Sequence, residues 1–181
     1  MDAKQLLVKA RLLEIGKGRI GANFASKKEI DGLVGKKYIK KSGSGFSLTD
    51  KGRKAVKIVM TGGVFDILHL GHVSTLEKAR KMGDALVVAV AHDATVKRRK
   101  GRRALHSATE RAALLQKLRC VDLALVGHPR DREVTVRRVR PDVVVFGYDQ
   151  KQDLRLKAKV RKLRSRLRGR GFKTSGIIDD M

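Results

Sequence analysis

The feature that most restricts the fold is an alternation of short apolar runs with stretches of helical spacing, which starts near residue 56. The runs are rich in β-branched residues, as is typical of strands buried on both faces of a parallel sheet. They occupy residues 56–60, 85–91, 121–126 and 143–146. Helical spacing fills the intervals at residues 71–82, 107–119 and 131–139. This order predicts a doubly wound parallel α/β sheet with right-handed crossovers.

A glycine-rich turn follows the first of these strands, where residues 58–72 read IVMTGGVFDILHLGH. Gly62 and Gly63 carry no Cβ, so backbone N–H groups after the strand are able to approach phosphate oxygens closely. His69 and His72 are three residues apart, so one helical turn places both imidazoles on the same side, and Gly71 leaves that side open. Ligands of such sheets bind at the carboxyl ends of the strands. We therefore expect this turn to meet residues 147–149, which follow the last strand.

The histidine pair has two other interpretations, a metal site and a pair of surface residues. Zinc needs three or four protein ligands, and no Cys or carboxylate stands at a supporting spacing nearby, so no metal site is predicted. An isolated H-x-G-H is also compatible with two surface histidines on a helix. The glycines together with Phe65 and Asp66 favour a phosphate-handling turn over that interpretation.

The stretch GGVFDILHLGH resembles the first signature of the H-x-G-H nucleotidyltransferases, the cytidylyltransferase-like superfamily. Later segments fall where that superfamily has its other motifs: Lys100-Gly101-Arg102, Glu110-Arg111, Arg140-Pro141-Asp142 and VVVFGYDQ at residues 143–150. The resemblance covers roughly residues 57–180. It implies a Rossmann-like nucleotidyltransferase domain over residues 57–181.

The resemblance also implies roles for individual residues. His69 and His72 would stabilise the pentacoordinate α-phosphorus, and Lys100 and Arg111 would assist them. The implied nucleotide-binding residues are Gly62, Gly63, Val64, Phe65, Asp66, Leu70, Gly71, Lys97, Asp149, Thr174 and Ser175. Among them, Lys97 would hold phosphates from a basic loop, and Asp149 would lie near the base or the ribose. Thr174 and Ser175 resemble a second, Ser/Thr-rich phosphate motif. Structural alternatives are an Arg111 that pairs on a helix surface and an Asp149 that caps a turn.

Chemistry and resemblance together imply the reaction. A phosphate acceptor is already ionised at neutral pH, so positioning and charge stabilisation remain for the protein to supply. The segments VFDILHLGH, DATVKRRKGR and RPDVVVFGYDQ are most similar to archaeal-type FAD synthases, which transfer AMP from ATP to FMN and release pyrophosphate. Mg²⁺ is expected to bridge the triphosphate oxygens. The alternatives are a CTP-dependent cytidylyltransferase acting on glycerol phosphate or a similar alcohol phosphate, and a DNA-binding regulator that senses a nucleotide. Intact His69 and His72 argue against a pure sensor.

Residues 1–56 form a second predicted domain. Helical spacing covers residues 3–15, Ser26 and Glu29 form a capping box for a helix to about residue 34, and residues 38–49 alternate around a flexible tip at 42–45. Thr49 or Asp50 is placed to cap a further helix. This plan resembles a winged helix-turn-helix. Residues 1–57 hold 15 Lys/Arg against 5 Asp/Glu, which suits nucleic-acid backbone contact, and a docking or dimerisation domain is the alternative.

The whole chain has a net charge of +25, which predicts attraction to nucleotides, nucleic acid or anionic membranes. Residues 151–170 carry ten Lys/Arg and one acid and predict a basic helix, with a solvated face, nucleic-acid contact and membrane docking as its alternative uses. Cys120 is the sole cysteine, which favours a reducing compartment. We expect a cytoplasmic protein without a membrane span or signal peptide, and a homodimer stays open.

Overall fold

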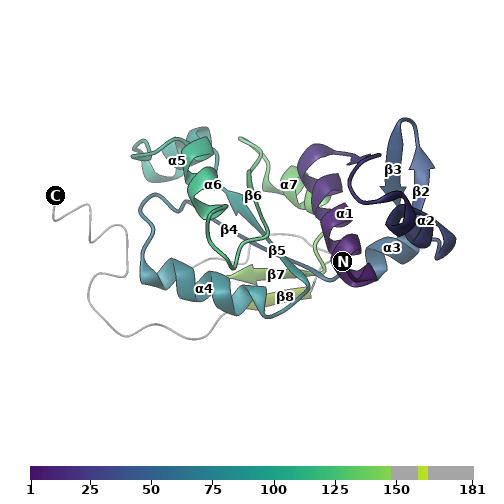
Figure 1. Cartoon of the computed structure of the whole chain (residues 1–181). Helices are drawn as coiled ribbons and strands as arrows, with labels where there is room; N and C mark the ends of the chain where they lie inside the picture. Colours follow the sequence, from purple (N-terminus) through teal and green to yellow (C-terminus); the bar gives the residue numbers. More distant parts are fainter. Residues whose placement is uncertain (148–158, 163–181) are drawn as a thin grey trace. The chain divides into compact units, whose positions relative to one another are not determined.

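The structure is a computed structural model that describes residues 1–147 and 159–162. The chain divides into two compact units, Met1–Lys57 and Ile58–Met181. The elements of the first unit are α1 (Ala3–Lys17), β1 (Ile20–Gly21), α2 (Lys27–Gly35), β2 (Ile39–Ser42), β3 (Gly45–Leu48) and α3 (Asp50–Lys54). Those of the second are β4 (Ile58–Gly63), α4 (Leu70–Arg80), β5 (Ala85–Val90), α5 (Asp93–Lys100), α6 (Ala108–Leu115), β6 (Leu123–Val126), α7 (Arg132–Val139), β7 (Val143–Phe146) and β8 (Lys159–Lys162) (Figure 1).

Local capping sets the helices of the first unit. The predicted capping box at α2 is confirmed, because both the backbone N–H and the hydroxyl of Ser26 donate to Glu29, at 3.0 and 2.7 Å. These hydrogen bonds hold the pKa of the Glu29 carboxyl below its usual range. Thr49 caps α3 by accepting from the Gly52 N–H at 3.0 Å. The chain thus enters each of these two helices at the residue that its sequence predicts.

The predicted hairpin of the first unit is also present. β2 and β3 pair antiparallel, with Gly43 at a φ of 56° in the connecting turn. The two-residue strand β1 pairs with the other edge of β3 and completes a three-stranded sheet. Because β1 lies between α1 and α2, these two helices do not follow one another directly. The buried apolar residues of this unit include Leu6, Leu7, Ala10, Ile15, Ile20, Leu33, Ile39 and Leu48.

The second unit is an α/β fold with a five-stranded parallel sheet of the Rossmann-like type, in the order β6-β5-β4-β7-β8. β4 pairs with both β5 and β7, so the glycine-rich turn leaves the centre of the sheet. The chain runs from β4 outward to β6 and then crosses to β7 on the other side of β4. The strand order therefore reverses between β4 and β7, and at such a point a crevice opens beyond the carboxyl ends.

The two faces of this sheet have different neighbours. Alternate strand residues, among them Val59, Val88, Val90, Val143 and Val145, form a buried core cluster with Leu76 and Ala79 of α4 and Ala112 and Leu115 of α6. The residues between them face the opposite side. Small residues stand there at the centre of the sheet, with Gly62 on β4 and Ala89 on β5. This pattern fills one face with side chains and leaves space on the other.

Two expectations about secondary structure are wrong. Residues 93–100 form the helix α5 and not a basic loop, because His92 accepts from the Ala94 N–H at 3.1 Å and Gly101 ends the helix at a φ of 69°. Only Thr95 and Val96 of this helix are buried, so it shows no apolar period. Residues 159–162, within the expected basic helix, form β8, which pairs with the edge of β7. Backbone pairing determines that strand, since all four side chains are exposed.

Candidate functional site

The turn after β4 has a strained backbone. Phe65 has a φ of 53°, in the left-handed region that residues with a side chain rarely adopt. Its ring is buried and folds back over Gly63, where a Cβ would lie 2.9 Å from two ring carbons. A side chain at position 63 would therefore require the Phe65 ring to shift, so this glycine accommodates the ring as well as the approach of a ligand.

His69 and His72 are brought together by the first turn of α4. His69 is the N-cap residue, and its carbonyl accepts from the His72 N–H at 2.9 Å. The two imidazole rings are stacked, with centroids 3.8 Å apart and planes 24° from parallel. The Phe65 ring packs edge-on against His72 at 5.2 Å. The predicted placement of both imidazoles on one side is confirmed, and Leu70 between them is exposed.

Asp66 faces a loop of the protein. Its carboxylate accepts from the Leu105 N–H at 2.8 Å and from the Arg102 guanidinium at 3.2 Å. Its side chain is only 1% exposed. Protein donors therefore engage both oxygens, and the residue ties the turn after β4 to the loop at residues 101–107. This geometry favours a structural link over the nucleotide contact that the resemblance implies.

Arg111 is likewise buried, with a side chain 1% exposed. Its guanidinium donates to four acceptors: the carbonyls of His106 (2.9 Å), Val64 (2.5 Å) and Ala91 (3.0 Å), and the Asp93 carboxylate (2.6 Å). It does not pair with Glu110 on the helix surface, because Glu110 accepts from Ser107. With its donors engaged by protein acceptors, Arg111 is placed to position the strand ends and not to hold a phosphate.

The predicted basic residues lie on α5. Lys97 and Lys100 are both exposed, and only Lys100 contributes to the cavity described below. Asp149, Thr174 and Ser175 lie outside the described residues. Tyr148 lies outside them as well, so Gly147 is the one described residue of the turn expected to meet His69 and His72.

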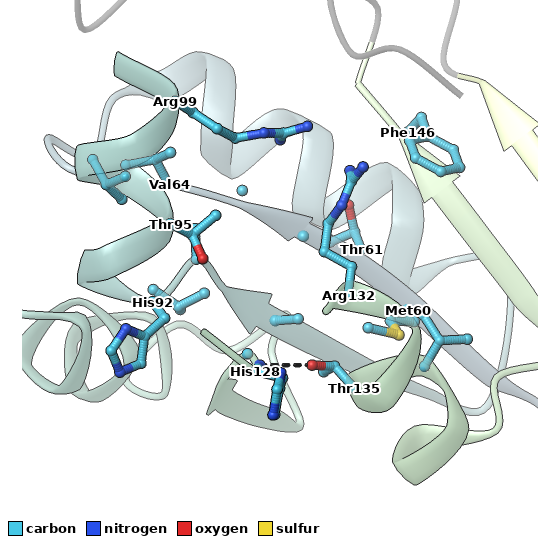
Figure 2. A pocket seen from close by; sticks show the side chains of 18 of the residues that line it. Met60, Thr61, Val64, His92, Thr95, Arg99, His128, Arg132, Thr135 and Phe146 are labelled. Carbon is cyan, nitrogen blue, oxygen red and sulfur yellow. Dashed lines mark hydrogen bonds between the residues drawn. The ribbon is translucent and has the colours of Figure 1, made fainter. Parts of the chain in front are cut away.

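A cavity of about 490 Å³ opens at the carboxyl ends of the strands, on the sheet face opposite α4 and α6. Its walls come from the three strands β4, β5 and β7, from the residues after β6, and from α5 and α7, and Gly62, Gly63 and Val64 belong to its lining. Figure 2 shows Met60 of β4 and Phe146 of β7 among the lining residues, with the Arg99 and Arg132 side chains extending from α5 and α7. His69 and His72 are not part of the lining. The cavity adjoins the glycine-rich turn through Gly62, Gly63 and Val64.

Several polar residues of this cavity were missed by the sequence pattern. His92 and His128 each follow a strand by two residues, and Thr95, Arg99 and Arg132 come from the helices behind them. Thr135 accepts from the His128 N–H at 2.8 Å (Figure 2), and Thr95 donates to the Pro129 carbonyl at 2.8 Å. The position of His92 and His128 at the carboxyl ends of neighbouring strands was the available signal.

The described part of the chain has neither a cluster of metal ligands nor a helix that could span a membrane. Within residues 1–147 and 159–162, no three His, Cys, Asp or Glu side chains are grouped so as to hold a metal ion. None of the helices in the same residues has the length and apolar character of a membrane span. Cys120 is a half-buried free thiol, and burial raises its pKa.

Comparison with known proteins adds to this geometry. The sequence profile of the family described as cytidylyltransferase-like matches residues 60–175. A FAD synthase of Pyrococcus abyssi is 44% identical over 114 residues, which cover 62% of this chain and 76% of that protein. FAD synthases of Thermococcus sibiricus and Thermoplasma volcanium are each 47% identical, over 56% and 58% of this chain and 69% and 74% of their own lengths.

Among solved structures, a protein of Thermoplasma volcanium GSS1 described as a lipopolysaccharide core biosynthesis protein is similar, with a TM-score of 0.56 and 41% identity. The match covers 60% of this chain and 96% of that one.

Proposed function

Because this chain belongs to the cytidylyltransferase-like family, we propose that it transfers AMP from ATP to FMN, forming FAD and pyrophosphate. The observation that carries the proposal is the 44–47% identity to three FAD synthases over 69–76% of their lengths. The stacked pair His69 and His72 supports it, because it supplies two imidazole donors beside the glycine-rich turn.

The proposed reaction requires no general base. An ionised phosphate oxygen of FMN attacks the α-phosphorus of ATP, and a new P–O bond forms to FMN. The bond from the α-phosphorus to the pyrophosphate oxygen breaks, and its electron pair leaves with pyrophosphate. His69 and His72 donate hydrogen bonds to the α-phosphate, where charge develops, and the N-terminus of α4 adds its dipole. Lys97 and Lys100 offer positive charge to the leaving phosphates.

We assign the cavity to the acceptor. Its volume lies within the range of small-molecule sites, and its sheet wall is apolar, as a flat flavin ring requires. Arg99 and Arg132 supply cations from α5 and α7, while Gly62 and Gly63 connect the cavity to the turn where the phosphates would meet. The flavin ring would therefore lie against Met60 and Phe146, with its phosphate directed toward the turn.

We expect Mg²⁺ to arrive bound to the triphosphate oxygens. Among the described residues, no three His, Cys, Asp or Glu side chains are grouped so as to hold it. Asp149, Thr174 and Ser175 remain proposed contacts for the base and the phosphates.

A second candidate function concerns residues 1–56, for which we propose a winged-helix-like, DNA-binding role. The supporting observation is the exposure of Lys27 and Lys28 on α2 and of Lys40 and Lys41 on β2. The full chain should retard duplex DNA with steep salt dependence. Exchanging Lys40 and Lys41 for Gln should reduce the slope of log K against log salt by about 1–2. An unchanged slope would support a docking role for this unit.

The proposed enzymatic function is tested by a substrate panel. ATP, CTP, GTP and UTP are each incubated with Mg²⁺ and with FMN, glycerol phosphate, phosphoethanolamine or phosphopantetheine, and pyrophosphate release is followed. ATP with FMN should exceed the other pairs. Preference for CTP with an alcohol phosphate would replace the proposal by a cytidylyltransferase. Nucleotide binding without turnover of any pair would favour a nucleotide-sensing regulator.

A further inference from the structure

The backbone strain at Phe65 needs a restraint, and Arg111 provides one. Phe65 adopts a φ of 53°, which is unfavourable for a residue with a side chain, and its buried ring anchors the Phe65 side of the turn. The other end is the carbonyl of Val64, which accepts from Nη1 of Arg111 at 2.5 Å. Arg111 projects from α6, which packs on the filled face of the sheet.

This contact also sets the direction of a donor. The Val64 carbonyl and the Phe65 N–H belong to one planar peptide group, which is trans because the described chain contains no cis bond. In a trans peptide the C=O and N–H bonds point in opposite directions. Holding the carbonyl toward Arg111 therefore directs the Phe65 N–H away from α6. Within the part of the chain that the structure describes, no protein acceptor is recorded for this N–H.

The orientation of Arg111 is itself fixed by three further acceptors. The carbonyls of His106 and Ala91 and the carboxylate of Asp93 accept from the other N–H donors of its planar guanidinium group, called the fork below. Asp93 in turn accepts from the Ala108 N–H at 3.1 Å. The fork thereby joins the ends of β4 and β5 to the start of α6. A lysine has one point charge and a flexible stem, so it is unable to reproduce this geometry.

We propose that Arg111 is a positioning residue that locks the turn after β4 and aims the Phe65 N–H at the phosphates of the bound nucleotide. This rests on the proposed function for the identity of the ligand, but the orientation of the peptide is independent of the acceptor. A donor aimed in advance stabilises developing charge without reorganisation during the reaction. Arg111 itself touches neither phosphate nor acceptor.

The first arm leaves Arg111 unchanged and uses NMR of the wild-type protein labelled with ¹⁵N-phenylalanine. The chain has five Phe residues, and the Phe65 amide signal is the one lost in Phe65→Leu. Addition of ATP with Mg²⁺ should move the Phe65 signal downfield, in the direction of a new hydrogen bond. If other signals report binding and the Phe65 signal stays in place, the proposal is wrong.

The second arm uses Arg111→Lys and Arg111→Met, with Arg80→Lys as the matched control. Arg80 pairs with Asp122 at 2.7 Å and donates to the Gly83 carbonyl at 2.9 Å, at the amino ends of β5 and β6. Both Arg111 variants should shift the free Phe65 signal, lose its response to ATP, and lower kcat for FAD formation by about 10²-fold with a smaller change in KM. Arg80→Lys should keep the signal, its response and the rate.

The possible results separate the two proposals. Wild-type activity in Arg111→Lys would show that a positive charge at position 111 is sufficient for the reaction without the hydrogen bonds of the guanidinium group. That result overturns the positioning role. If the wild-type protein forms no FAD but ATP moves the Phe65 signal only when Arg111 is present, the substrate assignment fails and the positioning role stands. If the Arg111 variants do not fold, the wild-type titration still tests the Phe65 donor, and a Phe65 signal that ATP leaves in place overturns the proposal.

Discussion

Exchange of Asp66 for Asn tests whether this residue supports the turn after β4 or contacts the nucleotide. The carboxylate is nearly fully buried and accepts from the Leu105 N–H at 2.8 Å and from Arg102 at 3.2 Å. Asn keeps one acceptor oxygen and presents an NH₂ group to the other donor, so one contact is lost.

The expected magnitude follows from which contact is lost. Leaving the Leu105 N–H unsatisfied costs about 1–3 kcal/mol. Losing the ion pair instead costs less, about 0.2–1 kcal/mol, because Arg102 is 38% exposed and solvent screens it. We expect the amide to rotate so that its oxygen accepts from the backbone, which places the loss of unfolding free energy at about 1 kcal/mol. That corresponds to a fall in Tm of about 2–4 °C.

The assays are thermal unfolding followed by circular dichroism, and FAD formation at 25 °C. Asp66→Asn should lower Tm by this amount and reduce kcat/KM by less than about 10-fold, since protein donors occupy the carboxylate. Asp122→Asn is the matched control, because Asp122 accepts from the Leu86 N–H and from Arg80, both at 2.7 Å. An unchanged Tm together with a 10²-fold loss of activity would refute the structural role and restore the nucleotide contact.

Further predictions concern α6, acid stability and the cavity. Ser107→Ala removes the cap of α6 and should lower the unfolding free energy by about 1 kcal/mol in urea titrations, whereas an unchanged midpoint would contradict the cap. Hydrogen bonds from Ser107 lower the pKa of Glu110; for Asp93, burial raises the pKa, but bonds from Ala108 and Arg111 outweigh it. The stability that these two carboxylates contribute is complete above the ordinary carboxyl pKa values of about 4. It is lost as the pH falls through their lowered pKa values in the folded protein. Tm should therefore decline below about pH 4 and not between pH 5 and 7. Gly62→Val places a Cβ 3.1 Å from the Ala89 carbonyl and fills the cavity, so KM for FMN should rise about 10-fold or more, and an unaffected KM would remove the acceptor from the cavity.

The sequence predicts most of the parallel sheet because its strands are β-branched runs bounded by helices with clear apolar spacing. It also predicts that His69 and His72 share one side, since helix geometry determines that arrangement from their spacing alone. α5 escapes prediction because its ends are set by caps and only two of its residues are buried. β8 escapes because an exposed basic strand has no apolar alternation, and pairing with β7 determines it.

The roles of Asp66 and Arg111 illustrate what a motif leaves open. A motif identifies the residue type that a site needs, but not whether its polar atoms face a ligand or the protein. For both residues, long-range contacts decide the question: Asp66 meets a loop almost forty residues away, and Arg111 reaches the ends of two strands. The cavity depends similarly on small residues of adjacent strands, Gly62 and Ala89, whose register only the folded sheet defines.

The most direct test of the central claim is the rate of FAD formation from ATP and FMN by the wild-type chain and by His69→Ala and His72→Ala. FAD and pyrophosphate should appear in equal amounts with the wild-type protein. Each variant should keep a cooperative thermal transition and lose about 10²-fold or more in kcat, the scale expected for a lost transition-state donor. Near-normal rates in both folded variants would contradict the assignment of the histidine pair to catalysis.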